Sequence, residues 1–187
     1  MENLNKKQKT LFLTIGAPGS GKTTWVNKYV KENGGVKVSR DEIRKKIVDK
    51  NTTTNFFSKE TIVFNEFTSN IQKCLNSSNE DKIFADATHL SPGSREKLLS
   101  HLELDNTKII GVYFNLSLED VLTNNALKPK EDIVPEHSVV HMYEKINFAY
   151  VEPLDEVWTV NNEGVITNVE NFSDFRSTFR APERFLI

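Results

Sequence analysis

The sequence has a single cysteine, Cys74, among its 187 residues. One cysteine excludes an internal disulfide and a cysteine-based metal cluster. Long apolar runs are also lacking, since no stretch approaches the roughly 18–20 residues that a membrane-spanning helix needs. From these absences we expect a cytoplasmic protein of a reducing compartment, with no membrane association.

Charge of one sign is not in excess either, because the formal net charge is −2. The chain as a whole therefore does not attract nucleic acid through its net charge. Any nucleic-acid site must be a local basic patch, and the candidate is the group Arg40, Arg44, Lys45 and Lys46.

Repeats, linkers and low-complexity tracts are absent as well, and the length suffices for one domain with its own hydrophobic core. We expect a basic tail over 1–9, one domain over 10–170 and a C-terminal tail over 171–187. Strand-like and helix-like segments alternate along the domain. This alternation predicts an α/β fold with a central, mostly parallel five-stranded sheet flanked by helices.

The expected elements follow from apolar periodicity and from helix-capping signals. Strands are expected at 11–15, 35–38, 82–86, 109–114 and 156–160. Helices are expected at 21–33, 58–75 and 135–150, with others beginning after the caps Ser39, Ser91 and Ser117. Glu42 would complete a capping box with Ser39. A short edge strand at 165–167 stays open, and the polar stretch 127–134 is read as a mobile loop.

A glycine-rich loop is the strongest signal in the chain. Residues 16–23 read Gly-Ala-Pro-Gly-Ser-Gly-Lys-Thr, between an apolar strand and a helix. The glycines let successive backbone N–H groups converge on phosphate oxygens, and the N-terminus of the helix attracts the same anion. Lys22 adds a charge for the terminal phosphates, and the Thr23 hydroxyl suits Mg²⁺. The pattern predicts a P-loop nucleotide-binding fold.

A second candidate site follows the strand at 35–38, where open α/β sheets bind ligands. Asp41 is a candidate base for the hydroxyl of a phosphate acceptor. Arg44, one helical turn on, is a candidate for holding an anionic group of that acceptor. Acidic residues are also favoured in the first turn of any helix, so a purely structural role for Asp41 stays open.

The strand at 82–86 ends in a third candidate group. Asp86 can bind Mg²⁺ through water or orient the nucleophile, although turn preferences alone also explain an aspartate there. Thr88 is a candidate acceptor contact. His89 is expected to be a solvated loop residue.

Two further groups carry alternatives. Lys128 and Lys130 lie in the polar loop and either close over ATP phosphates as a lid or stay solvated. His137 and His141 stand four apart on an expected helix, a spacing that can hold zinc. A third ligand is not evident in the sequence, so we read these histidines as part of an exposed helix face.

These pieces together resemble the phage-type polynucleotide 5′-kinases and the small P-loop kinases around them. The matching segments fall in order over roughly 10–160: Leu13–Trp25, Arg40–Arg44, Asp86–Pro92 with Arg95, and Val134–Pro135. The resemblance implies ATP and Mg²⁺ as cofactors. It implies that Asp41 is the general base for a 5′-hydroxyl and that Arg40 and Arg44 bind the acceptor. It also implies that Asp86 and Thr88 shape the acceptor pocket. Thr23 and Asp86 would bind the metal. The nucleotide-binding set would be Gly16, Ala17, Pro18, Gly19, Ser20, Gly21, Lys22, Thr23 and Thr24.

The sequence departs from this family in its lid. The family usually supplies lid arginines that stabilise the transferring phosphoryl group, whereas Asn124 and Lys128 occupy that stretch here. Lys128 is the best substitute, although lysine is a poorer bidentate phosphate ligand than arginine. Three functions therefore stay open: a kinase of DNA or RNA 5′-hydroxyl ends, a kinase of a small molecule or of hydroxymethylated bases in DNA, and a nucleotide-dependent binding protein. The small-molecule acceptors considered are nucleosides, sugars and antibiotics.

Overall fold

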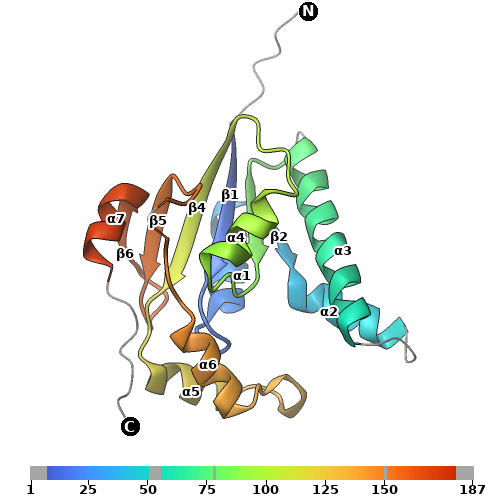
Figure 1. Ribbon diagram of the computed structural model, residues 1–187, viewed down its shortest axis with the longest axis vertical. Helices are drawn as coiled ribbons and strands as arrows, with labels where there is room; N and C mark the ends of the chain where they lie inside the picture. Colours follow the sequence, from blue (N-terminus) through green and yellow to red (C-terminus); the bar gives the residue numbers. More distant parts are fainter. Residues whose placement is uncertain (1–7, 51–55, 78, 150, 180–187) are drawn as a thin grey trace, which may run out of the picture.

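The computed structural model describes residues 8–50, 56–77, 79–149 and 151–179, which build a sheet covered by helices (Figure 1). The strands are β1 (Lys9–Ile15), β2 (Val36–Ser39), β3 (Lys82–Asp86), β4 (Thr107–Phe114), β5 (Glu156–Val160) and β6 (Ile166–Asn171). The helices are α1 (Lys22–Asn33), α2 (Arg40–Lys50), α3 (Phe56–Asn76), α4 (Pro92–Leu99), α5 (Leu118–Ala126), α6 (Glu136–Glu144) and α7 (Phe172–Thr178), with a 3₁₀ turn η1 (Lys130–Asp132).

The sheet has six strands in the order β2-β3-β1-β4-β5-β6. The pairs from β2 to β5 are parallel, which confirms the expected mostly parallel α/β sheet. The expected strand number is one too low, because β6 pairs antiparallel with β5 at the edge. A tight turn makes this pairing possible: Gly164 adopts a φ of 74°, and the backbone N–H of Asn161 donates to Val165.

The topology gathers three chain segments at one end of the sheet. The loop 16–21 follows β1, and the strands β2 and β3 end in register at Ser39 and Asp86. Since parallel strands share the direction of their carboxyl ends, these segments meet at the end of the sheet where α5 and α6 lie (Figure 1). The predicted site residues are thus assembled by strand order.

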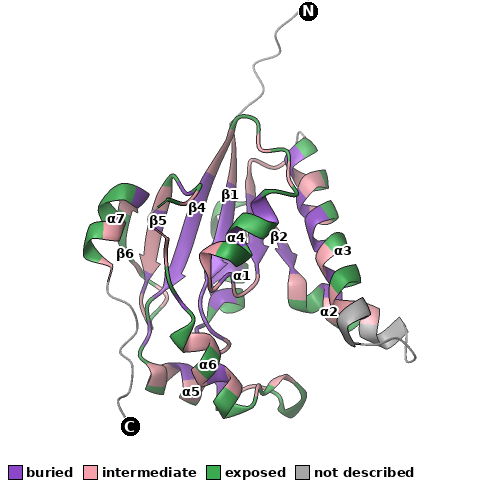
Figure 2. Ribbon diagram, viewed as in Figure 1, coloured by how far each residue is buried: buried purple, intermediate pink, exposed green. Residues whose placement is uncertain are grey.

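The hydrophobic core has two halves, one on each face of the sheet. Successive side chains of a strand point to opposite faces, so Leu11 and Leu13 pack with α3 and α4 while Phe12 packs with α1. Figure 1 shows α4 and α1 on opposite faces of the sheet, and Figure 2 shows buried residues concentrated in the central strands. The fully buried β1 interior fixes the position at which the glycine-rich loop begins.

Two expectations about the C-terminal third were wrong or incomplete. Helix α6 ends at Glu144 and not near residue 150, because the chain turns to pack Ile146 and to donate from the Asn147 N–H to the carbonyl of Leu90. The stretch from 171, expected only as a C-terminal tail, contains α7, whose phenylalanines at 172 and 175 are buried in the core. Residues 1–7 and 180–187 lie outside the described residues, and the division into tails and a domain stays a prediction.

Within the described residues, no helix combines the length and the apolar character that crossing a membrane requires.

Candidate functional site

The glycine-rich loop has the backbone that its sequence predicts. Gly19 and Gly21 have φ values of 97° and 81°, in the left-handed region that favours glycine. A Cβ on Gly19 would also lie 2.2 Å from the carbonyl oxygen of Val121, so no larger residue fits there. Gly21 offers no side-chain cap to α1, and the first turn of α1 carries no acidic residue. The N–H groups at this helix end are therefore available to an external anion.

Lys22 is buried at the start of α1 and points back over the loop. Its ammonium donates to the carbonyl oxygen of Ala17 at 2.6 Å and to the hydroxyl oxygen of Ser20 at 3.2 Å. Burial lowers the pKa of Lys22 to about 8, and attraction to Asp86 and, more weakly, to Asp41 acts against this shift. A phosphate would replace these neutral loop oxygens with a charged acceptor.

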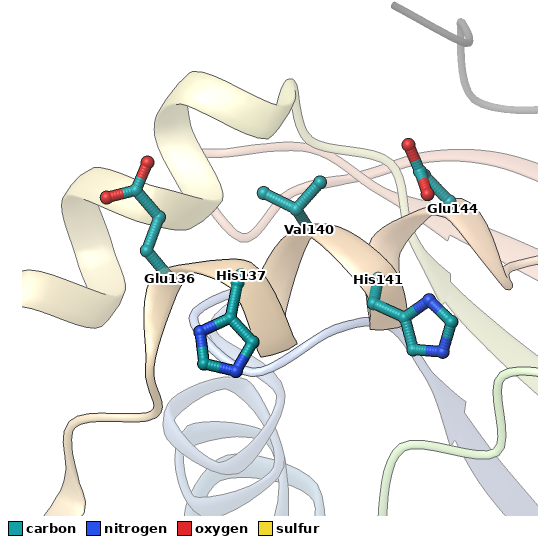
Figure 3. Close-up of a pocket in the computed structure, with 5 residues that line it drawn as sticks. All are labelled: Glu136, His137, Val140, His141 and Glu144. Carbon is teal, nitrogen blue, oxygen red and sulfur yellow. The ribbon is translucent and has the colours of Figure 1, made fainter.

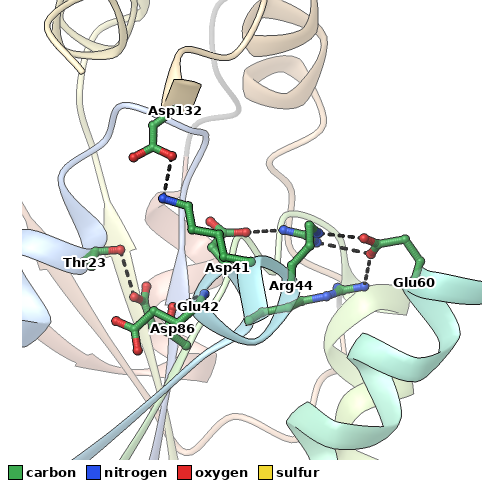
Figure 4. A network of polar contacts seen from close by, with 10 residues as sticks. Thr23, Asp41, Glu42, Arg44, Glu60, Asp86 and Asp132 are labelled. Carbon is green, nitrogen blue, oxygen red and sulfur yellow. Dashed lines mark hydrogen bonds and ion pairs between the residues drawn. The ribbon is translucent and has the colours of Figure 1, made fainter. Parts of the chain in front are cut away.

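Thr23 and Asp86 form the oxygen pair that the sequence predicts for a metal. The Thr23 hydroxyl donates to Asp86 Oδ2 at 2.8 Å (Figure 4). Asp86 is buried, and burial raises its pKa while Thr23 and Lys22 act to lower it. Hydroxyl and carboxylate oxygens suit Mg²⁺, which usually keeps several waters and binds substrate phosphates as well. No cluster of three or more histidine, cysteine or acidic side chains suited to a metal occurs in the described ranges.

The acceptor-side residues meet at the start of α2. Asp41 is highly exposed, with 79% of its side chain accessible, and forms an ion pair with Arg44. Arg44 also makes a bidentate contact with Glu60 of α3, at 2.6 and 3.1 Å, and Arg40 contacts the same carboxylate at 3.1 Å (Figure 4). Hydrogen bonding to Arg44 lowers the pKa of Glu60 despite partial burial. Arg40 Nε is buried without a hydrogen-bond partner among the described residues, so this side chain keeps an unused donor.

Glu60 is the residue that sequence reasoning missed. It falls within the helix expected at 58–75, where the sequence assigns it no role, and residues 51–55 are outside the described ranges. The spacing of residues in the sequence does not reveal that α3 packs against α2 and brings Glu60 to Arg40 and Arg44. Ser39 does accept from the Glu42 N–H at 3.4 Å, as expected of a cap, but the Glu42 carboxylate pairs with Lys37 at 2.6 Å.

The polar loop after α5 is tied together by one buried side chain. The Asn125 amide donates to the carbonyl of Val134 at 2.7 Å and accepts from the Val134 N–H at 3.3 Å. Lys128, half-buried, donates to the same amide oxygen at 3.2 Å. Burial lowers the pKa of Lys128, and the carboxylates of Asp41 and Asp132 oppose the shift. The expected lid therefore brings Lys128 into electrostatic range of the loop and of Asp41, whereas Lys130 is exposed in η1.

His89 is buried, which makes the expectation of a solvated loop histidine wrong. The buried Nδ1 donates to the carbonyl of Thr14 at 3.0 Å, since a carbonyl only accepts. Its φ is 41°, and burial lowers its pKa to about 4. The fully buried Arg95 donates to the carbonyls of His89 and Asn147 at 2.7 Å and pairs with Glu152 at 2.6 and 2.7 Å. His89 and Arg95 thus fix the loop after β3.

That loop is also joined to the glycine-rich loop. The carbonyl of Thr88 accepts from the Gly16 N–H at 3.1 Å, and the Thr14 hydroxyl donates to the carbonyl of Ala87 at 2.7 Å. The half-buried Thr88 therefore lies beside the glycine-rich loop through its backbone, and its contact with an acceptor stays a prediction.

The histidine pair on α6 is exposed, as expected. His137 and His141 project from one helix (Figure 3). They border a shallow depression together with Glu136, Val140 and Glu144. No residue of the glycine-rich loop lines this depression, so it is separate from the site described above.

Comparisons with known proteins agree with the fold. A family model described as an AAA domain matches residues 11–149. Among solved structures, a chain of the Pnkp1/Rnl/Hen1 RNA repair complex superposes with a TM-score of 0.63 at 19% identity, over 78% of this chain and 46% of that one. A fungal RNA kinase gives 0.56 at 17% identity, over 87% and 77%. A sugar kinase from Janibacter sp. gives 0.58 at 12% identity, over 83% and 86%.

These structures share the fold with this chain at low sequence identity. The chain spans less than half of the length of the chain that it matches in the RNA repair complex. The superpositions include one protein described as an RNA kinase, one described as a sugar kinase and one described as a deoxyadenosine kinase.

Proposed function

The chain belongs to the AAA domain family, and we propose that it is an ATP-dependent kinase that transfers the γ-phosphate to a 5′-hydroxyl end of DNA or RNA. The observation that carries the proposal is the position of Asp41. Its exposed carboxylate lies in the first turn of α2, directly after β2, and β2 ends in register with Asp86 of β3 beside the glycine-rich loop. The same carboxylate acts against the lowered pKa of Lys22 and of Lys128. A hydroxyl bound at Asp41 would therefore face the phosphates held by the loop.

The nucleotide side of the site fits ATP with Mg²⁺. The uncapped N-terminus of α1, the glycine-rich loop and Lys22 would hold the phosphates. Thr23 and Asp86 would hold Mg²⁺, which supplies positive charge against the phosphate oxygens when bound. Thr24, exposed in the first turn of α1, completes the binding set that the sequence predicts.

The residues divide the transfer between them. Asp41 accepts the proton of the acceptor hydroxyl as its oxygen forms a bond to the γ-phosphorus. The bond between that phosphorus and the bridging oxygen breaks, and ADP leaves with the electron pair. Lys22 and Lys128 oppose the negative charge that develops on the transferring group. ATP thus supplies the phosphoryl group, and Asp41 takes the proton that the acceptor hydroxyl loses.

The acceptor side favours a strand with a phosphate next to its terminal hydroxyl. Arg44 is held by Glu60 and Asp41 and keeps 35% of its side chain exposed, and planar guanidinium groups suit phosphate. Arg40, with its unused Nε donor, is the second candidate for this contact. Lys45 and Lys46 extend the basic patch along α2. The accessible side chain of Asp41 supports a site that admits the end of a polymer.

A small-molecule acceptor is the second candidate, and one observation favours it. Glu60 and Asp41 together balance the charges of Arg40 and Arg44, and the lid offers Lys128 in place of arginine. A balanced acceptor side suits an uncharged hydroxyl compound such as a nucleoside or a sugar. A hydroxymethylated base in DNA would combine features of both acceptor classes.

The two candidates are separated by phosphate transfer from γ-labelled ATP with Mg²⁺. The acceptors are a 5′-hydroxyl oligonucleotide, the same oligonucleotide with a 5′-phosphate as a matched control, and a panel of nucleosides and sugars. Label on the 5′-hydroxyl oligonucleotide alone, lost in Asp41→Asn, supports the polynucleotide kinase. Label on a small molecule alone replaces the substrate class. Bound ATP without transfer to any acceptor would favour a nucleotide-dependent binding protein.

A further inference from the structure

An ion pair joins the lid to the helix that carries Asp41. The Lys45 ammonium of α2 lies 2.5 Å from a carboxylate oxygen of Asp132 in η1. The side chain of Lys45 is 60% exposed and that of Asp132 is 33% exposed, so solvent reaches both partners. Among the described residues, this ion pair links α2 to the lid. Figure 4 shows Asp132 above Asp41.

Lys45 belongs to the same helix face as Asp41. The two residues are four apart on α2, and side chains at this spacing are neighbours. The carboxylates that act on Lys45 are those of Asp132, Asp41 and Glu131, and the hydrogen bond to Asp132 contributes most to its raised pKa. The ammonium therefore sits one helical turn beyond the expected base, among carboxylates.

The lid, residues 127–134, is held by buried hydrogen bonds where it meets α5 and by an exposed ion pair at Asp132. Asn125 is buried and pins both ends of the loop through its contacts with Val134. At the tip, Asp132 meets Lys45 in an exposed pair, a type of contact that contributes little to stability. A phosphate group that reaches Lys45 can displace the Asp132 carboxylate, and the contacts between Asn125 and Val134 stay intact.

We propose that Lys45 is a second phosphate subsite for the acceptor strand, and that Asp132 occupies it when no acceptor is bound. The proposal rests on the proposed function, because it presumes a nucleic-acid acceptor whose end lies at Asp41. Arg44 would contact the phosphate beside the terminal nucleoside, and Lys45, the next residue, would contact a phosphate further along the strand. Asp132 then acts as an internal competitor, and an acceptor without that further phosphate gains nothing from displacing it.

The test measures the affinity of a 5′-hydroxyl single-stranded oligonucleotide by fluorescence anisotropy over a range of salt concentrations. Asp132→Asn should bind the oligonucleotide roughly two- to fivefold more tightly at low salt, the range expected for removing an exposed competing pair. Each phosphate contact on a single strand contributes about −0.7 to the slope of log affinity against log salt. In the wild type the displaced Asp132 carboxylate stays near the bound strand and retains a cation there, so the slope should be shallower than that of Asp132→Asn by up to about this amount.

Two variants serve as matched controls. Glu131→Gln removes the same charge from the neighbouring residue, so it should leave the salt slope at the wild-type value if the direct pair is what matters. Lys45→Ala combined with Asp132→Asn should lose both the gain in affinity and the steeper slope. Equal slopes in wild type and Asp132→Asn, or the same slope change in Glu131→Gln, would overturn the subsite.

Transfer to the same oligonucleotide separates the two proposals. If the wild type phosphorylates the oligonucleotide but Asp132→Asn leaves its affinity and slope unchanged, the subsite fails and the polynucleotide kinase stands. If the wild type phosphorylates no 5′-hydroxyl strand, the proposed function fails and the subsite fails with it. A change in ATP affinity in place of acceptor affinity would assign Lys45 to the nucleotide and overturn the proposal as well.

Discussion

The hydroxyl of Thr23 donates to the carboxylate of Asp86 across 2.8 Å, although 63 residues separate them in the chain. One follows β1 through the glycine-rich loop, and the other ends β3, the strand paired with β1. Neither side chain would meet the other without this parallel pairing. The strand order of the sheet therefore brings together the two side chains of the candidate metal site.

The role of Asp41 is tested against its neighbour in the same helix turn. Asp41→Asn should lower turnover about 100-fold or more, with ATP binding nearly unchanged, if the carboxylate accepts the proton. Glu42→Gln is the matched control, because both acids occupy the first turn of α2 and both favour the helix dipole. A similar small effect in both variants would mean that Asp41 acts only on helix stability.

Glu60 should control acceptor binding and leave ATP binding alone. Glu60→Gln removes the carboxylate that orients Arg44 and Arg40, and charge-assisted hydrogen bonds of this kind contribute about 1.5–3 kcal/mol. We expect the KM for the acceptor to rise about tenfold or more, since each 1.4 kcal/mol changes an equilibrium tenfold. The KM for ATP should stay close to the wild-type value.

The control for Glu60 is Glu66→Gln, a change of the same kind on the exposed side of α3, where Glu66 contacts Asn70. A Glu60→Gln variant whose KM values for ATP and acceptor rise together would point to general damage to the fold. Steady-state kinetics with each substrate varied in turn distinguishes the two results.

The pattern of correct and incorrect expectations has a physical origin. The bounds of β3 and β5 agree with the sequence expectation because short apolar runs between turn residues define strands locally. The glycine-rich loop is likewise encoded by local backbone requirements at Gly19 and Gly21. The end of α6 depends instead on the contact between Asn147 and Leu90, which lie 57 residues apart, and no local pattern reports it.

The same distinction separates the site residues. Arg40, Asp41 and Arg44 are near neighbours on α2, so helical spacing was enough to group them. Glu60 joins them from another helix, and only the packing of α3 on α2 brings it there. The burial of His89 depends on the same kind of long-range packing.

ATP affinity should depend on pH through Lys22. Burial lowers the pKa of Lys22 to about 8 in the free protein, so the ammonium loses its proton as the pH rises above 8. Bound phosphates favour the protonated form, and binding above pH 8 must therefore take up a proton. We expect ATP affinity to fall by up to about tenfold per pH unit above 8, as proton linkage for one group requires.

Lys22→Arg provides the comparison for that pH profile, because arginine stays charged throughout the range. Its ATP affinity should be lower or higher by a constant factor but nearly flat between pH 8 and 9.5 in a titration followed by calorimetry. A wild-type profile as flat as that of Lys22→Arg would contradict the assigned role of the buried ammonium.

His89 should make the folded state sensitive to acid. The buried imidazole has its pKa lowered to about 4, chiefly by burial and next by the positive charges of Arg95, Arg40 and Lys22. The unfolded chain binds the proton near the ordinary value of 6.5, so between pH 6.5 and 4 only the unfolded state gains a proton. The free energy of unfolding should therefore fall with decreasing pH in this window, by about 3 kcal/mol in total.

His89→Asn is the informative variant, because asparagine tolerates the positive φ of 41° and its amide can donate to the Thr14 carbonyl in place of Nδ1. Urea unfolding at pH 7 and at pH 4.5 measures the free energy of each protein. The loss between the two pH values should be smaller in His89→Asn than in the wild type by about 2–3 kcal/mol, since the variant has no group to titrate there. An equal loss in both proteins would show that other groups cause the acid sensitivity and that His89 takes up its proton in the folded state as readily as in the unfolded chain.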